Sequence, residues 1–270
     1  MRVISPMLGN AAQTTARFAL AALLVGGFYT VKRKSVRLGR RDFTFAVLIG
    51  LASFGTGFLF TVAANSTKIA NSLSVMYAGG IVSALVIGTL FLKEKLGLLK
   101  IAAAGVALLG LSLYAQGFAA LNVGVLAALG AGLCDSIAHA FRKQVRGADR
   151  NVIVMCQYIF GGIVAALATL LSGGELVRHV SAGAIIGLLA YAAVSVGLGK
   201  FLLYGFSHFD VNVGAVILAT QLFFATLLGM VFLHEFPAAR ELAGAGLIFF
   251  ASIVTVVDMR VLAARLKPLL

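Results

Sequence analysis

Three side chains that could carry a charge or a proton share one face of an apolar stretch in the middle of the chain. Asp135, His139 and Arg142 are spaced four and three residues apart, so an α-helix would bring them onto one face. Charges inside an apolar segment are costly and usually face a cavity or a partner. Because histidine titrates near neutral pH, an Asp135–His139 pair could take up and release protons. The alternative is a buried ion pair between Asp135 and Arg17 or Lys200 that stabilises the bundle.

Two further cations, Arg17 and Lys200, lie inside apolar stretches. Arg17 either packs and pairs within the fold or offers a cavity cation to a substrate carboxylate. Lys200 either belongs to the same cavity or extends its ammonium group to the membrane surface, as lysines near the end of a span do. Both interpretations stay open for each residue.

Four uncharged polar side chains also lie within apolar stretches, and each could line a cavity or make a hydrogen bond between helices. They are Tyr77, Gln157, Tyr158 and Gln221. The sequence has no HExxH motif, Walker loop or paired-cysteine site, which are the patterns expected of a metal, nucleotide or nucleophile centre. We therefore predict binding of a small polar molecule without catalysis, and expect neither a metal site nor a cofactor.

The chain that must position these residues has 270 amino acids, of which 61% are hydrophobic and 11% charged. A soluble protein of this composition would expose too much apolar surface. About 20 apolar residues form a helix that crosses a hydrocarbon core of roughly 30 Å. Nine such spans are predicted, at about 8–30, 43–64, 71–92, 98–116, 122–141, 152–172, 182–206, 211–233 and 241–259. The predicted fold class is an all-α polytopic membrane protein.

The distribution of basic residues predicts how the chain is oriented. Sixteen of the 22 lysines and arginines fall in alternate loops or in the C-terminal tail, and four fall on the other side. Loops rich in lysine and arginine stay in the cytoplasm. We therefore expect a multi-pass protein of the bacterial inner membrane with a cytoplasmic C-terminus. The chain has a formal net charge of +13. Because the topology explains this positive charge, nucleic acid is not an expected partner.

The sequence contains an internal duplication at an offset of 141 residues. Residues 70–94 align without a gap on residues 211–235, and Glu94 falls on Glu235. Paired spans lie five apart, so the two halves run in opposite directions, as in many secondary transporters. The fifth span has no partner. We therefore expect an inverted repeat of five-helix units with nine of ten helices present and the first missing; the alternative is a genuine nine-span protein.

Two motifs are predicted to be structural. Glu94 and Glu235 each follow a span, where a carboxylate is unfavourable at the end of its own helix but favourable at the start of the next. Each is therefore expected to cap the helix that follows it. Gly183 and Gly187 have the spacing of closely packed membrane helices.

The chain resembles the EamA branch of the drug/metabolite transporter superfamily. The resemblance is carried by LKEKLGLLKIAAAGVALLG at 92–110, LHEFPAARELAGAGLIF at 233–249 and SPMLGNAAQTTARFALAALL at 5–24, the last similar to the family's second helix. It covers essentially the whole chain and implies two repeats, 1–116 and 117–270, around a central cavity. It also implies movement of small metabolites such as amino acids, often outward, by alternating access. Many members have a proline within the third and eighth spans, which this chain lacks.

The function expected from these features is a secondary transporter that exports small metabolites such as amino acids. Its expected partners are the small-molecule substrate and the lipid bilayer, with protons as a candidate coupling ion and a homodimer as a candidate assembly. The rival functions are a membrane-embedded enzyme and an inactive, truncated membrane subunit.

Overall fold

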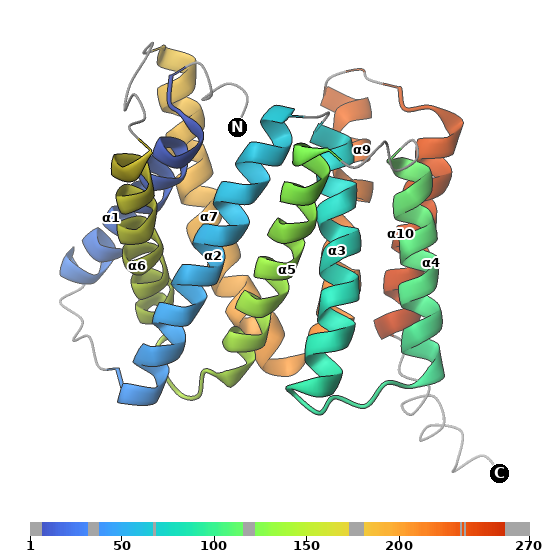
Figure 1. Ribbon diagram of the computed structural model, residues 1–270, viewed down its shortest axis with the longest axis horizontal. Coiled ribbons are helices and arrows are strands. Elements are labelled where there is room, and N and C mark those ends of the chain that lie inside the picture. Colours follow the sequence, from blue (N-terminus) through green and yellow to red (C-terminus); the bar gives the residue numbers. More distant parts are fainter. Residues whose placement is uncertain are drawn as a thin grey trace.

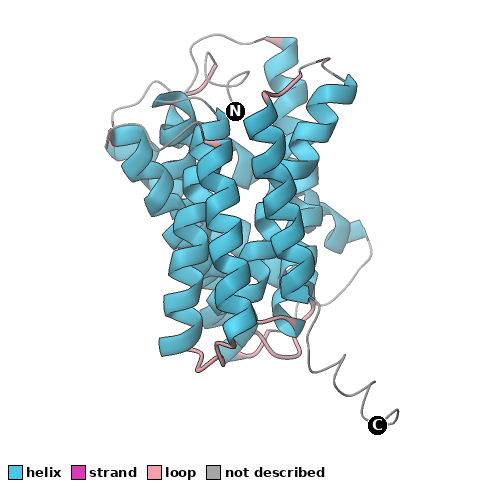
Figure 2. Cartoon of the chain, turned by 90° about the vertical axis from the view of Figure 1, so that its right-hand side faces the viewer, coloured by secondary structure: helices cyan, strands magenta, loops and turns pink. Residues whose placement is uncertain are grey.

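The computed structural model describes residues 7–31, 38–66, 69–115, 122–172, 181–232, 234 and 236–256. Every regular element in those ranges is an α-helix (Figure 2). In chain order the helices are α1 (Asn10–Val31), α2 (Arg40–Ser66), α3 (Ile69–Leu90), α4 (Leu98–Tyr114), α5 (Val123–Gln144), α6 (Arg150–Leu171), α7 (Ala182–His208), α8 (Val211–Ala219), α9 (Gln221–Phe232) and α10 (Ala239–Val256). Eight spans are long and apolar enough to cross a membrane, and α4 adds a shorter apolar helix of 17 residues. The predicted all-α, multi-pass membrane fold is confirmed.

Successive spans run in opposite directions through the bundle (Figure 1). The links that follow α3, α5 and α7 lie together at the lower end in Figure 1, whereas the end of α2 and the start of α3 lie at the upper end. We call the lower end the basic face, because Lys93, Lys95 and Arg146 lie in its links, and we call the upper end the far face.

The helices pack as an interleaved pair of repeats. Helix α5, the first helix of the second repeat, lies between α2 and α3 of the first repeat (Figure 1). Helix α1 packs against α6 and α4 packs against α10, and each of these pairs joins two helices that are equivalent in the internal duplication. The position of α5 brings Asp135 and His139 to the middle of the bundle.

Glycines allow two of these contacts to be made by backbone atoms. A Cβ on Gly110 of α4 would lie 2.7 Å from the carbonyl oxygen of Gly244 in α10, and a Cβ on Gly244 would lie 2.6 Å from that of Gly110. A Cβ on Gly132 of α5 would collide with the backbone of Met76 and Gly80 in α3. Small residues let membrane helices approach until their backbones touch, and these contacts set the distance between neighbouring helices.

The eighth predicted span, 211–233, differs from the expectation of one continuous helix. Helix α8 ends at Ala219, and the Thr220 N–H bonds to the carbonyl oxygens of Ile217 and Leu218. The Thr220 hydroxyl also donates to the Ile217 carbonyl oxygen, at 2.6 Å. A threonine hydroxyl that bonds a carbonyl of the preceding turn competes with the helical pattern. The span is therefore interrupted without a proline, directly before Gln221.

The close packing predicted for Gly183 and Gly187 is wrong for the part of the chain that the structure describes. A Cβ at either position would have no neighbour within 4 Å among the described residues. Their helix turns this side outward, and Ile186 is 67% exposed. The GxxxG spacing creates a smooth surface on a helix, but a packed contact also needs a partner helix at that surface.

Candidate functional site

A cavity of about 360 Å³ lies between helices of the two repeats. It is lined by Thr56, Gly57, Phe60, Ala64, Ile69, Leu73, Met76, Tyr77, Asp135, His139, Tyr191, Leu198, Leu202, Leu218 and Gln221. The lining extends from Ala64 and Ile69, where α2 and α3 meet at the far face, down to His139 in α5. The volume falls in the range of small-molecule sites, which are mostly apolar with a few polar groups.

The floor of the cavity is formed by the predicted polar stripe on α5. Arg142 Nη1 lies 2.6 Å from His139 Nδ1, and His139 Nε2 lies 3.2 Å from Asp135 Oδ2. Arginine has only N–H donors, so Nδ1 of His139 must accept and its proton must be on Nε2, which donates to Asp135. His139 is therefore neutral in this arrangement. Its ring also stacks on Phe206, with centroids 4.0 Å apart.

Asp135 is the more exposed of the two stripe residues that line the cavity. Its side chain is 24% exposed, whereas that of His139 is 2% exposed. In the described part of the chain its partner is the neutral His139 ring, which donates a hydrogen bond to it, and it has no ion pair with an arginine or a lysine. The alternative prediction, an ion pair of Asp135 with Arg17 or Lys200, is therefore wrong. Asp135 and His139 lie one turn apart on the same helix. Neither Arg17 nor Lys200 is needed to hold the carboxylate in place.

Tyr77 and Gln221 join the two repeats across the cavity wall. The Tyr77 hydroxyl in α3 donates to Gln221 Oε1 at the start of α9, with 2.6 Å between the two oxygens. Both residues line the cavity, so the two roles considered for them, lining and interhelical hydrogen bonding, coexist. Because the Tyr77 proton is used in this bond, its oxygen lone pairs and the Gln221 amide N–H groups remain available to a bound molecule.

Arg17 lies behind the cavity wall. Its side chain donates to the Gln13 carbonyl oxygen at 3.1 Å and to the hydroxyls of Thr14 and Thr61, both at 2.9 Å. Its guanidinium carbon lies 4.8 Å from the ring centroid of Tyr191, which lines the cavity. Arg17 is 2% exposed. It therefore contacts the cavity wall through Tyr191, a residue that the sequence alone does not single out.

The remaining candidates, Gln157, Tyr158 and Lys200, do not line this cavity. The Tyr158 hydroxyl donates to the Ser195 carbonyl oxygen at 2.7 Å, which joins α6 to α7. Gln157 is buried at 3% exposure. Lys200 Nζ lies 5.7 Å from the ring centroid of Phe28, a cation–π contact between α7 and α1. These three side chains therefore contribute to helix packing in this structure.

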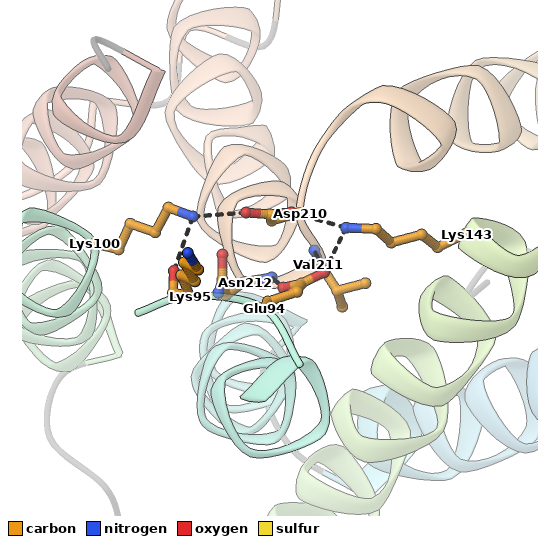
Figure 3. A network of polar contacts seen from close by, with 7 residues as sticks. All are labelled: Glu94, Lys95, Lys100, Lys143, Asp210, Val211 and Asn212. Carbon is orange, nitrogen blue, oxygen red and sulfur yellow. Dashed lines mark hydrogen bonds and ion pairs between the residues drawn. The ribbon is translucent and has the colours of Figure 1, made fainter. Parts of the chain in front are cut away.

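A second polar cluster lies at the basic face (Figure 3). Glu94 accepts hydrogen bonds from the backbone N–H of Val211 at 2.8 Å and from that of Asn212 at 3.4 Å. It also pairs with Lys143 Nζ at 2.7 Å. Its carboxylate therefore lies at the N-terminus of α8, where the helix dipole favours a negative charge.

The prediction that Glu94 caps the following helix is wrong. Helix α4 begins after Gly97, and no side chain caps it. The link turns back at Lys93, whose φ of 54° is in the left-handed region, and this turn directs Glu94 toward α8 of the other repeat. Its counterpart in the duplication, Glu235, lies outside the described residues.

Asp210 completes this cluster. Its carboxylate pairs with Lys100 Nζ at 2.6 Å and with Lys143 Nζ at 2.8 Å. Burial by itself would raise the pKa of Asp210, but hydrogen bonds from the two lysines outweigh this effect and lower the pKa below its usual range. Lys143 thus bridges Glu94 and Asp210, and the cluster ties together the starts of α4 and α8 and the ends of α3 and α5.

Comparison with known proteins agrees with this architecture. A solved structure titled "Crystal structure of protein" is 18% identical over 93% of this chain and 89% of its own, with a TM-score of 0.74. At that identity the likeness shows a common fold. No curated protein matches the sequence significantly. The model of the EamA-like transporter family matches twice, over residues 2–116 and 122–257. The chain therefore belongs to the EamA-like transporter family, a family of membrane transporters within the drug/metabolite transporter superfamily.

Proposed function

We propose that this chain is a secondary transporter that exports a small organic molecule by alternating access. The observation that carries the proposal is the opposite placement of two features. The cavity extends from the far face to Asp135 and His139, while the Glu94–Lys143–Asp210 cluster ties the two repeats together at the basic face. An inverted repeat with a central site and one closed end is what alternating access requires.

The positive-inside rule makes the basic face cytoplasmic. Under this assignment the cavity faces outward, and the polar cluster is the closed inner gate. Opening that gate requires Glu94 to leave the N–H groups of Val211 and Asn212. In alternating access, contacts at the far face form as this gate opens. The cavity is then open to the cytoplasm and closed to the outside.

Asp135 is the group through which proton movement would couple to export. Its carboxylate is exposed to the cavity, and an intramembrane carboxylate is a common proton carrier in transporters. His139 serves a different role in this proposal. Its Nδ1 accepts from Arg142, so His139 could take a second proton only after losing that hydrogen bond.

Counterflow in proteoliposomes tests the transport function. The purified protein is reconstituted, and the vesicles are loaded with an unlabelled pool of amines, amino acids or nucleosides. We expect labelled substrate to accumulate only when the matching pool is inside. Failure of every pool to drive accumulation, with protein correctly inserted, would contradict the proposal.

Thiol labelling tests the direction in which the cavity opens. Both native cysteines, Cys134 and Cys156, are replaced by serine, and a single cysteine is placed at Leu73 in the cavity wall. A membrane-impermeant maleimide added from the outside should modify it. A cysteine at Leu203, which is 4% exposed, is the matched control and should resist. Labelling of the cysteine at position 73 from the cytoplasmic side, and not from the outside, would reverse the assigned orientation.

A further inference from the structure

We propose that the cavity binds an organic cation, an amine attached to an apolar body, in preference to an amino acid or an organic anion. Asp135 is the residue that determines this specificity. The inference rests on the proposed function, since it names the chemical class that the transporter's cavity would take.

The formal charge on the described lining comes from one residue. Asp135 and His139 are the titratable acid and base on it, and the hydrogen bond from Arg142 to Nδ1 holds His139 neutral. The nearby cations are withdrawn from the lining: Arg142 is 3% exposed, and Arg17 lies behind Tyr191. A substrate carboxylate would therefore meet the Asp135 carboxylate without a counter-charge on the described lining.

The oxygens of Asp135 and Tyr77 favour a substrate with N–H donors, while the Gln221 amide N–H groups offer donors to an acceptor elsewhere on the substrate. Oδ2 of Asp135 accepts from His139, and in the described part of the chain Oδ1 has no partner. The Tyr77 hydroxyl donates its hydrogen bond to Gln221, so its oxygen presents lone pairs to the cavity. An ammonium group has three N–H donors and no acceptor. It matches a site in which a carboxylate oxygen and a phenol oxygen are both free to accept.

The rest of the cavity suits an apolar body. Large hydrophobic side chains from four helices form its walls: Phe60, Leu73, Met76, Leu198, Leu202 and Leu218. Such a wall buries a ring or an alkyl chain favourably. It also removes water from the ammonium group, and a desolvated charge needs a fixed counter-ion. Asp135 supplies that counter-ion, which makes its charge decisive for binding.

Three ligands that share a phenethyl group separate the charge classes. Phenethylamine is a cation, phenylalanine a zwitterion and 3-phenylpropanoate an anion at neutral pH. Binding of each is measured by calorimetry with the full chain in lipid nanodiscs. We expect phenethylamine to bind, and the other two to bind at least about tenfold more weakly, because each brings an unpaired carboxylate into the site. Stronger binding of phenylalanine or phenylpropanoate, or no binding of phenethylamine, would overturn the inference.

The variant Asp135→Asn removes the charge and keeps the shape. It should lose phenethylamine binding while its melting temperature stays close to that of the wild type. Asp149→Asn is the matched control, because it makes the same charge change at the N-terminus of α6, and asparagine caps a helix as well as aspartate does. Unchanged phenethylamine binding in Asp135→Asn would overturn the role of Asp135.

Counterflow then separates this inference from the proposed function. Exchange of phenylalanine without exchange of phenethylamine would leave a transporter and reject the amine class. Binding of phenethylamine through Asp135, with no exchange of any pool, would keep the amine class and reject transport.

Discussion

Glu94 accepts a hydrogen bond from the backbone N–H of Val211, a residue 117 positions later in the chain and in the opposite repeat. The distance from Oε1 to the nitrogen is 2.8 Å, and the Glu94 side chain is 3% exposed. A buried carboxylate at a helix N-terminus is stabilised by the free N–H groups and by the helix dipole. This contact is therefore a specific, breakable tie between the two halves of the protein.

The first prediction concerns this tie. Glu94→Gln keeps an oxygen for the Val211 N–H but removes the charge that Lys143 contacts. We expect a loss of about 1.5 to 3 kcal/mol of stability, the range for a hydrogen bond to a charged group, seen as a lower melting temperature in detergent. Glu241→Gln is the control, since Glu241 accepts from Ala238 N at an exposed site. A normal melting temperature with altered substrate preference would instead assign Glu94 to the substrate site.

The second prediction concerns pH. The pKa of Asp210 is lower in the folded protein than in the unfolded chain, where an aspartate titrates near about 3.9. Its pairs with Lys100 and Lys143 therefore stabilise the fold at neutral pH, and this contribution is lost as the pH falls through the lowered pKa. Melting temperatures of the wild type and of Asp210→Asn should differ at pH 7 and converge in strong acid. A constant difference at all pH values would exclude this linkage.

The third prediction concerns the tautomer of His139. Nitrogen NMR of histidine-labelled protein should find Nδ1 of His139 unprotonated and Nε2 protonated, because Arg142 donates to Nδ1. Arg142→Met removes that donor and leaves Nδ1 of His139 free to be protonated, which the nitrogen signals would report. The exposed residue His208 serves as the internal reference. A doubly protonated His139 in the wild type near neutral pH would contradict the assignment.

The fourth prediction concerns the contact between α3 and α5. In Gly132→Ala the new methyl group would meet backbone atoms of Met76 and Gly80, which cannot move aside as a side chain can. Overpacking of this kind costs about 1 to 3 kcal/mol, and the melting temperature should fall accordingly. Gly105→Ala is the matched control, because a Cβ there has no neighbour within 4 Å among the described residues. An equal effect of both substitutions would point to helix propensity instead.

The spans could be predicted from the sequence because each is a long apolar run, and a run of that length has one stable arrangement in a bilayer. The stripe of Asp135, His139 and Arg142 could be predicted for a similar reason, since helical spacing alone brings it together. The break at Thr220 could not, because threonine is tolerated within many helices and its hydroxyl interrupts this one only through local geometry.

The contacts between segments far apart in the sequence could not be predicted from it. Tyr77 and Gln221 were each recognised as polar side chains in apolar spans, but their hydrogen bond joins positions 144 residues apart. Its place in the sequence predicts that Glu94 caps α4, the next helix. In the structure Glu94 accepts from the N-terminus of α8 instead. Asp210 was not selected at all, although an aspartate directly before an apolar span is a recognisable helix start.

The tie between Glu94 and α8 also has a consequence for biosynthesis. The ribosome makes Glu94 long before Asp210 and Val211, so the first repeat enters the membrane with this carboxylate lacking its later partners. Lys143 is made in between and can meet Glu94 first. The cluster at the basic face is completed only when the seventh and eighth spans have been inserted. A chain whose synthesis stops before that point would keep the Glu94–Lys143 pair but would lack the bonds to Val211 and Asn212 and both Asp210 pairs, so its two repeats would not be tied at this face.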